Sequence, residues 1–93
     1  MEELKKRYGK KSYANDRRRL NRKLKKAGIE FEWHHLYDGY QWTFPQSKYP
    51  NGDAIIHFGS YCNKDGKFET MGIGPEDDCV PRSAHELIEL LEE

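Results

Sequence analysis

The fold of this chain is decided by residues 31–44, which read FEWHHLYDGYQWTF. Aromatic rings and one histidine occupy alternate positions before Asp38-Gly39, and three more aromatic rings alternate after it. A period of two is typical of a β-strand, and Asp-Gly between two such runs is a strong signal for a two-residue hairpin turn. The stretch therefore predicts an antiparallel hairpin with an aromatic face.

Two further strands are expected after this hairpin. Residues 54–58 form a third strand that extends toward Tyr61, and residues 67–73 form a fourth. The sequence Lys64-Asp65-Gly66 turns the chain between them. Residues 74–82 are predicted to be an acidic loop.

A helix is expected at each end of this sheet. The first begins at Ser12, a favourable N-cap, and runs to Ala27, where Gly28 suits a left-handed C-cap. The second begins at Ser83 and runs to about Glu92, because Ser83 and Glu86 have the spacing of a capping box. The predicted apolar stripe of the first helix consists of Tyr13, Leu20, Leu24 and Ala27.

These elements predict one domain, residues 1–93, of the α+β class. An N-terminal helix, a four-stranded mostly antiparallel sheet and a C-terminal helix form two layers. Residues 1–11 are expected to be a basic arm, residues 12–28 the basic helix, and residues 29–93 the sheet with the C-terminal helix. No apolar run is long enough to span a membrane and no signal segment is seen, so neither a membrane nor export is expected.

The composition favours binding over catalysis. Of the 93 residues, 35% are apolar and 34% are charged, which leaves little material for a deep pocket. The acidic stretch 76–78 and the pair His34-His35 near Asp38 each lack the rest of a metal-dependent active site. We therefore expect no enzymatic activity.

The charge is segregated along the chain although the net charge is zero. Residues 1–28 carry twelve Lys or Arg against three acidic residues, and residues 29–93 carry four against thirteen. Such asymmetry points to a charged partner, either nucleic-acid phosphates or carboxylates on a protein, although a merely solvated helix would look similar. The candidate contact residues are Arg17, Arg18, Arg19, Arg22, Lys23, Lys25, Lys26, Glu76, Asp77 and Asp78. The aromatic strands are not interleaved with basic residues, which argues against a dedicated single-strand binder.

A structural zinc site is a second hypothesis. Thiolate and imidazole are the ligands zinc prefers, and a closed site needs four of them. The predicted ligands are Cys62, Cys79, His57 and His85. Strand alternation places His57 on the opposite strand face from Cys62 unless Gly59-Ser60 forms a bulge. His35, which shares the aromatic face, is the main substitute, and His34 is another. The spacings match no standard zinc motif, and two reduced cysteines with four ordinary histidines are the alternative.

Residues 37–93 resemble small phage and prophage proteins with a hairpin-rich sheet and a closing helix. The resembling pieces are Asp38-Gly39-Tyr40, Thr43-Phe44-Pro45, Gly52-Asp53, Ile56-His57, Gly59-Ser60-Tyr61, Glu69-Thr70-Met71-Gly72 and Asp77-Asp78. In size, charge and phage-like character the chain is similar to type II anti-CRISPR proteins, some of which carry zinc.

This resemblance implies a protein that binds an RNA-guided effector nuclease and blocks target-DNA loading or cleavage. We expect it to act as a monomer in the bacterial host cytoplasm. The class shares no catalytic motif, so no residue role is carried over from it. The alternative function is a small phage module that binds nucleic acid through the basic helix. A structural accessory protein without a charged partner is a third.

Overall fold

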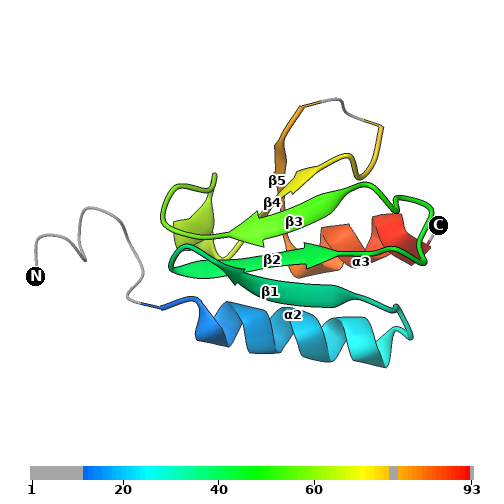
Figure 1. Cartoon of the computed structure of the whole chain (residues 1–93), viewed down its shortest axis with the longest axis horizontal. Helices are drawn as coiled ribbons and strands as arrows, with labels where there is room; N and C mark the ends of the chain where they lie inside the picture. The colour runs from blue at the N-terminus through cyan, green and yellow to red at the C-terminus, as the bar shows by residue number, and fades with distance from the viewer. Residues whose placement is uncertain (1–11, 76–77, 93) are drawn as a thin grey trace, which may run out of the picture.

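The computed structural model describes residues 12–75 and 78–92 (Figure 1). Its elements, in chain order, are α2 (Ala14–Lys26), β1 (Glu32–Leu36), β2 (Gly39–Thr43), β3 (Asp53–Ile56), the short 3-10 helix η1 (Asn63–Asp65), β4 (Phe68–Met71), β5 (Val80–Arg82) and α3 (Ala84–Glu92). The predicted arm, residues 1–11, lies outside the described residues. Within the described ranges, no helix has the length and apolar character needed to cross a bilayer.

The five strands form one sheet in the order β1-β2-β3-β4-β5, and every neighbouring pair is antiparallel. The α+β class and the two helices are confirmed, but the prediction of four strands is wrong. The fifth strand, β5, lies inside the predicted loop 74–82. It is short, contains Pro81 and forms an edge of the sheet, a position where proline is tolerated because one side of the strand needs no ladder hydrogen bonds.

The core lies between one face of the sheet and the two helices. Strand register places Trp42, Ala54 and Thr70 side by side on this face, which we call the inner face. Their neighbours Ile56 and Phe68 are fully buried with them, in one cluster that also contains Leu20 and Leu24 of α2 and Leu87 and Leu91 of α3. Both helices therefore cover the same face, and the opposite, outer face is not covered by either of them.

Helix α2 is seated by apolar and polar contacts. Tyr13, Leu20 and Leu24 are buried as predicted, and Asp16 is buried on the same stripe. The Asp16 carboxylate lies 3.4 Å from the Arg19 guanidinium, and the Tyr13 hydroxyl donates to Asn63 Oδ1 at 3.1 Å. The helix begins at Ala14 rather than Ser12, whose hydroxyl accepts from the Ala14 N–H at 3.2 Å.

The β1–β2 hairpin turns one residue earlier than predicted. Leu36 pairs with Gly39, so the turn residues are Tyr37 and Asp38, and Tyr37 takes a left-handed φ of 55°. Gly39 instead lies within β2, where a Cβ atom would stand 1.8 Å from the Ile56 carbonyl oxygen. Glycine is therefore required there by the close approach of β3.

The remaining predictions concern the C-terminal half. Strand β3 ends at Ile56, because residues after it turn rather than continuing toward Tyr61 as predicted. The turn at Gly66 is confirmed by its left-handed φ of 71°. The capping box of α3 is also confirmed: the Ser83 N–H donates to Glu86 Oε1 at 2.7 Å, and the Glu86 N–H donates to Ser83 Oγ at 3.1 Å.

Candidate functional site

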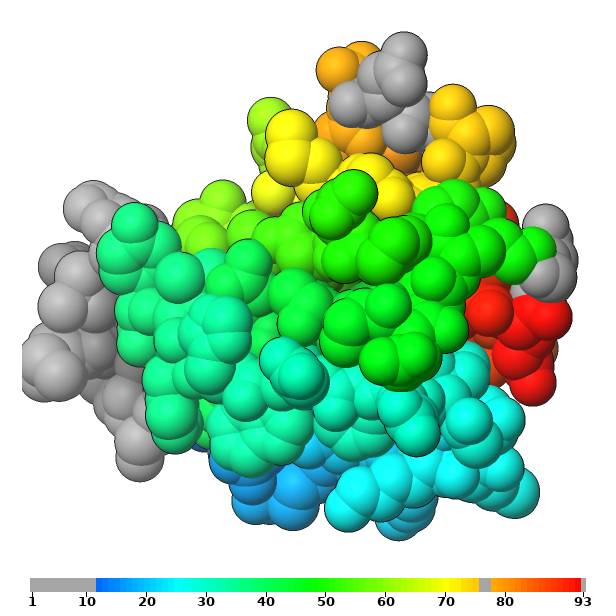
Figure 2. All heavy atoms as spheres, turned by 45° about the vertical axis from the view of Figure 1, so that its right-hand side comes forward, coloured from blue at the N-terminus to red at the C-terminus, as the bar shows by residue number. Residues whose placement is uncertain are grey.

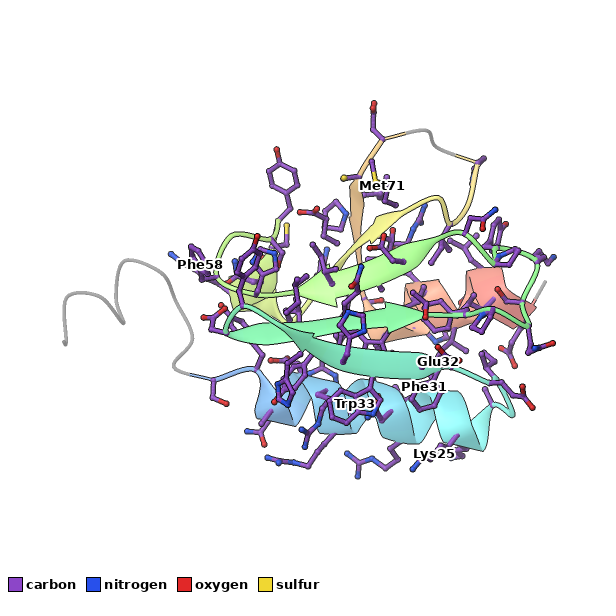
Figure 3. The ribbon with its side chains drawn as sticks, in the orientation of Figure 1. Lys25, Phe31, Glu32, Trp33, Phe58 and Met71 are labelled. Atoms are coloured by element: carbon purple, nitrogen blue, oxygen red, sulfur yellow. The ribbon has the colours of Figure 1, made fainter. Side chains whose placement is uncertain are left out.

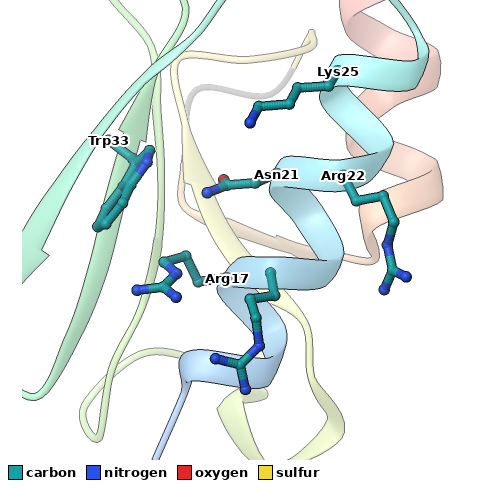
Figure 4. Close-up of a pocket in the computed structure, with 6 residues that line it drawn as sticks. Arg17, Asn21, Arg22, Lys25 and Trp33 are labelled. Carbon is teal, nitrogen blue, oxygen red and sulfur yellow. The ribbon is translucent and has the colours of Figure 1, made fainter.

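A cationic groove runs between α2 and the edge strand β1, which lie side by side (Figures 1 and 2). It has a volume of about 570 Å³ and opens widely to solvent. Its lining residues, most of which are labelled in Figure 4, are Arg17, Arg18, Asn21, Arg22, Lys25 and Trp33. Five of the six come from the helix, and the sixth is the indole of β1.

The helical period explains how these side chains meet. Arg18, Arg22 and Lys25 are spaced by four and three residues, so they share one row on the surface of α2. Arg17 and Asn21 form the neighbouring row, nearer to β1. In Figure 4 Arg17, Asn21 and Lys25 extend toward the Trp33 side of the helix, while Arg22 lines the outer margin of the groove with its guanidinium pointing away from Trp33.

Trp33 forms the wall of the groove on the sheet side. It is 38% exposed, although it stands on the inner face opposite the fully buried Trp42. The Arg17 guanidinium carbon lies 5.0 Å from the centre of the Trp33 ring and 5.1 Å from that of Tyr40. Both distances are within the range of a cation–π interaction, so Arg17 links the helix to the indole.

Asn21 is oriented by the core. Its Oδ1 accepts a hydrogen bond from the Trp42 indole N–H at 2.7 Å. Because the oxygen is held in this way, the amide NH₂ group is presented as a donor on the groove side, as Figure 4 shows.

The predicted cations of α2 do not all play the same part. Arg19 is anchored to the fold: it pairs with Asp16, donates to the Gly66 carbonyl at 2.8 Å and lies 5.8 Å from the Phe68 ring centre. Lys23 and Lys26 are exposed but do not line the groove. The predicted contact surface therefore divides into a groove side and a far side.

Of the three predicted acidic contact residues, only Asp78 belongs to the part of the chain that the structure describes. Glu76 and Asp77 lie outside the described residues, and Asp78 is exposed. A different acidic surface is visible on the outer face of the sheet. Glu32, Asp53 and Glu69 all belong to it by strand register.

The predicted zinc ligands are not brought together. Among residues 12–75 and 78–92, no three His, Cys, Asp or Glu side chains form a group that would hold a metal ion. His85 Nε2 lies 2.5 Å from Glu89 on the exposed side of α3, and His57 Nδ1 accepts from the Gly59 N–H at 2.9 Å. Cys62 is exposed. Zinc remains a prediction without geometric support, and zinc well below one equivalent in untagged protein would reject it.

Cys79 is a poor thiolate in this setting. Burial raises the pKa of its thiol, and the neighbouring Glu69 carboxylate raises that pKa further. Nucleophilic attack requires the thiolate, so the metal-free environment of Cys79 does not favour it.

Sequence reasoning missed Trp33 as a site residue, because the groove joins a helix and a strand that are separated along the chain. Figure 3 shows Trp33 over α2 and Lys25 on the last turn of that helix, whereas Phe58 and Met71 lie elsewhere on the molecule. Cations beside an accessible indole and an amide donor are suited to binding phosphates and a flat ring. Comparison with protein-family models, with curated proteins and with solved structures finds no match to this chain.

Proposed function

We propose that this chain binds nucleic acid through the cationic groove between α2 and β1. The observation that carries the proposal is the placement of charge on α2. Arg17, Arg18, Arg22 and Lys25 line one groove, while Asp16, the acidic residue of the helix, is turned into the core. The exposed surface of α2 therefore carries positive charge and no carboxylate.

Phosphates are the ligands that fit this surface best. Arginine side chains bind phosphate oxygens bidentately, and lysine contributes a point charge. Binding by such contacts releases counterions, so its affinity falls steeply with salt. The acidic remainder of the molecule would repel the phosphate backbone and orient the groove toward it.

Electrophoretic mobility shift over a salt series tests the proposal. The double variant Arg22→Glu/Lys25→Glu should weaken binding by about tenfold or more at moderate salt, because it reverses two charges at the groove. The matched control is Lys23→Glu/Lys26→Glu, which makes the same charge change on the same helix outside the groove. Equal losses in both variants would reject the groove, and failure of the wild-type chain to bind DNA or RNA would reject the function.

Inhibition of an RNA-guided effector nuclease is the second candidate, in keeping with the resemblance to type II anti-CRISPR proteins. The observation that favours it is the acidic outer face of the sheet, which neither helix covers and which carries Glu32, Asp53 and Glu69. Such a face would complement the cationic channel in which an effector holds nucleic acid.

Size-exclusion chromatography of the protein mixed with a type II effector tests this second candidate by detecting a complex. A complex that is lost in Glu32→Lys/Glu69→Gln but kept in Arg22→Glu/Lys25→Glu would support docking by the outer face. Absence of any complex would reject the candidate.

A further inference from the structure

We propose that the groove is specific for single-stranded nucleic acid, and that an unpaired base stacks on Trp33. This inference rests on the proposed function and names the form of nucleic acid that the same site takes. Basic residues and aromatic rings are separated along the sequence, but the fold brings Arg17, Asn21 and Lys25 next to the indole.

Trp33 has the properties of a stacking platform. It lies on β1, the edge strand of the sheet formed by residues 12–75 and 78–92, and it retains 38% of its surface exposed. Its ring is also held in place. Tyr40 and His35 make T-shaped contacts with it at 5.5 and 5.8 Å, and the Arg17 guanidinium lies over one side of it at 5.0 Å. A base would therefore stack on the exposed part of the ring that Arg17 does not cover. A ring that is both accessible and fixed loses little entropy when a base stacks on it.

The cations flank this platform. Arg17 and Lys25 are eight positions apart, which is about 12 Å along a helix axis. Figure 4 shows the indole across from Asn21, between these two side chains. A base on Trp33 would therefore have a cation on each side for its neighbouring phosphates. The Asn21 NH₂ group would face the edge of the base as a donor, a role open to any base with a carbonyl or ring-nitrogen acceptor.

A duplex would use only part of this site. Bases inside a double helix are stacked on one another and present their edges rather than their faces. A duplex would therefore contact the cations but not the Trp33 ring.

The groove volume of about 570 Å³ is within the range of pockets that hold a molecule of nucleotide size.

Tryptophan fluorescence provides the test, since the chain contains only two tryptophans and the other, Trp42, is fully buried. The probes are an oligothymidylate and an oligouridylate of about 12 nucleotides, within the usual site sizes, and a hairpin duplex of similar charge. Either single strand should quench Trp33 emission and bind more tightly than the duplex. Trp33→Phe should keep most of the affinity and lose the quenching.

Trp33→Leu keeps apolar bulk but removes the ring. It should weaken single-strand binding by roughly 5- to 150-fold, the effect of losing one stacked base, and leave duplex binding nearly unchanged. Trp42 emission reports whether the variant is folded, and Trp33→Phe provides a second test if it is not. Equal affinity of the wild type for single strand and duplex, or an unaffected Leu variant, would overturn the inference while leaving the proposed function standing. Failure to bind any of the three probes would overturn both.

Discussion

Gly39 illustrates a glycine whose role differs from the one its sequence context indicates. Asp38-Gly39 predicts a turn glycine with positive φ, yet the residue with positive φ in this turn is Tyr37. Gly39 is required because its Cα faces the backbone of β3, with the Ile56 carbonyl oxygen where a Cβ atom would stand. A hairpin was correctly predicted here, but a steric requirement set by the neighbouring strand cannot be read from the hairpin residues themselves.

Two glycine substitutions separate sterics from torsional preference. Gly39→Ala should cost about 3 kcal/mol or more of the free energy of unfolding, because the methyl group would meet backbone atoms that cannot yield without shifting β3. Gly28→Ala should cost only about 1–2 kcal/mol, since its φ is +74° but nothing lies within 4 Å of the added carbon. Urea unfolding measures both, and a milder loss at Gly39 than at Gly28 would contradict the close approach.

Arg19 is predicted to stabilise the fold, whereas Lys23, which does not line the groove, is predicted to contribute little to the free energy of unfolding. Arg19→Ala removes the ion pair with Asp16 and the hydrogen bond to the Gly66 carbonyl, so it should cost about 1–3 kcal/mol in urea unfolding. Lys23→Ala, the matched control on the same side of α2, should stay within about 0.5 kcal/mol of wild type. An Arg19 variant as stable as the control would show that these contacts do not hold the helix.

The same residues show how far sequence reasoning reached into the candidate site. Helical spacing predicted the basic surface of α2, but it could not separate Arg19, whose partner Asp16 is buried, from Arg22 at the margin of the groove. An acidic residue within the apolar stripe was the available signal. Trp33 had no such signal. Its neighbours in the groove come from α2, and the sequence does not show how the segment between α2 and β1 turns the chain.

At the scale of elements, local signals were reliable where the interaction is itself local. The capping box at Ser83 and Glu86 spans four residues, and both of its hydrogen bonds are formed. Strand β5 spans only three residues, including Pro81, and exists because β4 pairs with it. Its sequence carries no period long enough to be recognised, so an acidic loop was predicted in its place.

The capping box should contribute to stability in a pH-dependent way. Ser83→Ala should cost about 1 kcal/mol at neutral pH, as expected for loss of an N-cap. The pKa of Glu86 is lowered below its ordinary value of 4.5. The hydrogen bond from the Ser83 backbone is the largest cause, and the hydrogen bond with the Ser83 side chain is the second. The stabilisation that the ionised Glu86 carboxylate provides is therefore complete above pH 4.5 and is lost as the pH falls through the lowered pKa of the folded state.

Urea unfolding of wild type and Glu86→Ala at neutral and acidic pH checks this sign. The difference between the two proteins should be largest at pH 7 and should shrink as the pH falls below 4.5. Glu92→Ala, at the other end of α3, is the control and should show no such loss. A difference that grows toward acid would show that the carboxylate does not stabilise the helix.

At the scale of the whole molecule, the segregation of charge becomes a division between surfaces. Positive charge lies on α2, and the acidic residues Glu32, Asp53 and Glu69 lie on the sheet face turned away from both helices. The two-surface arrangement follows from the fold, because both helices cover the inner face. The sequence imbalance predicted opposite charges, but only the strand register shows which carboxylates share a face.

The salt dependence of binding measures how much of the positive charge takes part. Four cations line the groove, so single-strand affinity should fall with salt with a log–log slope of about −3, at about 0.7 per phosphate. Arg22→Glu/Lys25→Glu should reduce the magnitude of this slope to about half, because two of the four contacts are lost. Lys23→Glu/Lys26→Glu should leave the slope near the wild-type value, although it changes the net charge equally. Identical slopes in the two variants would mean that binding senses the overall charge of the molecule rather than contacts in the groove.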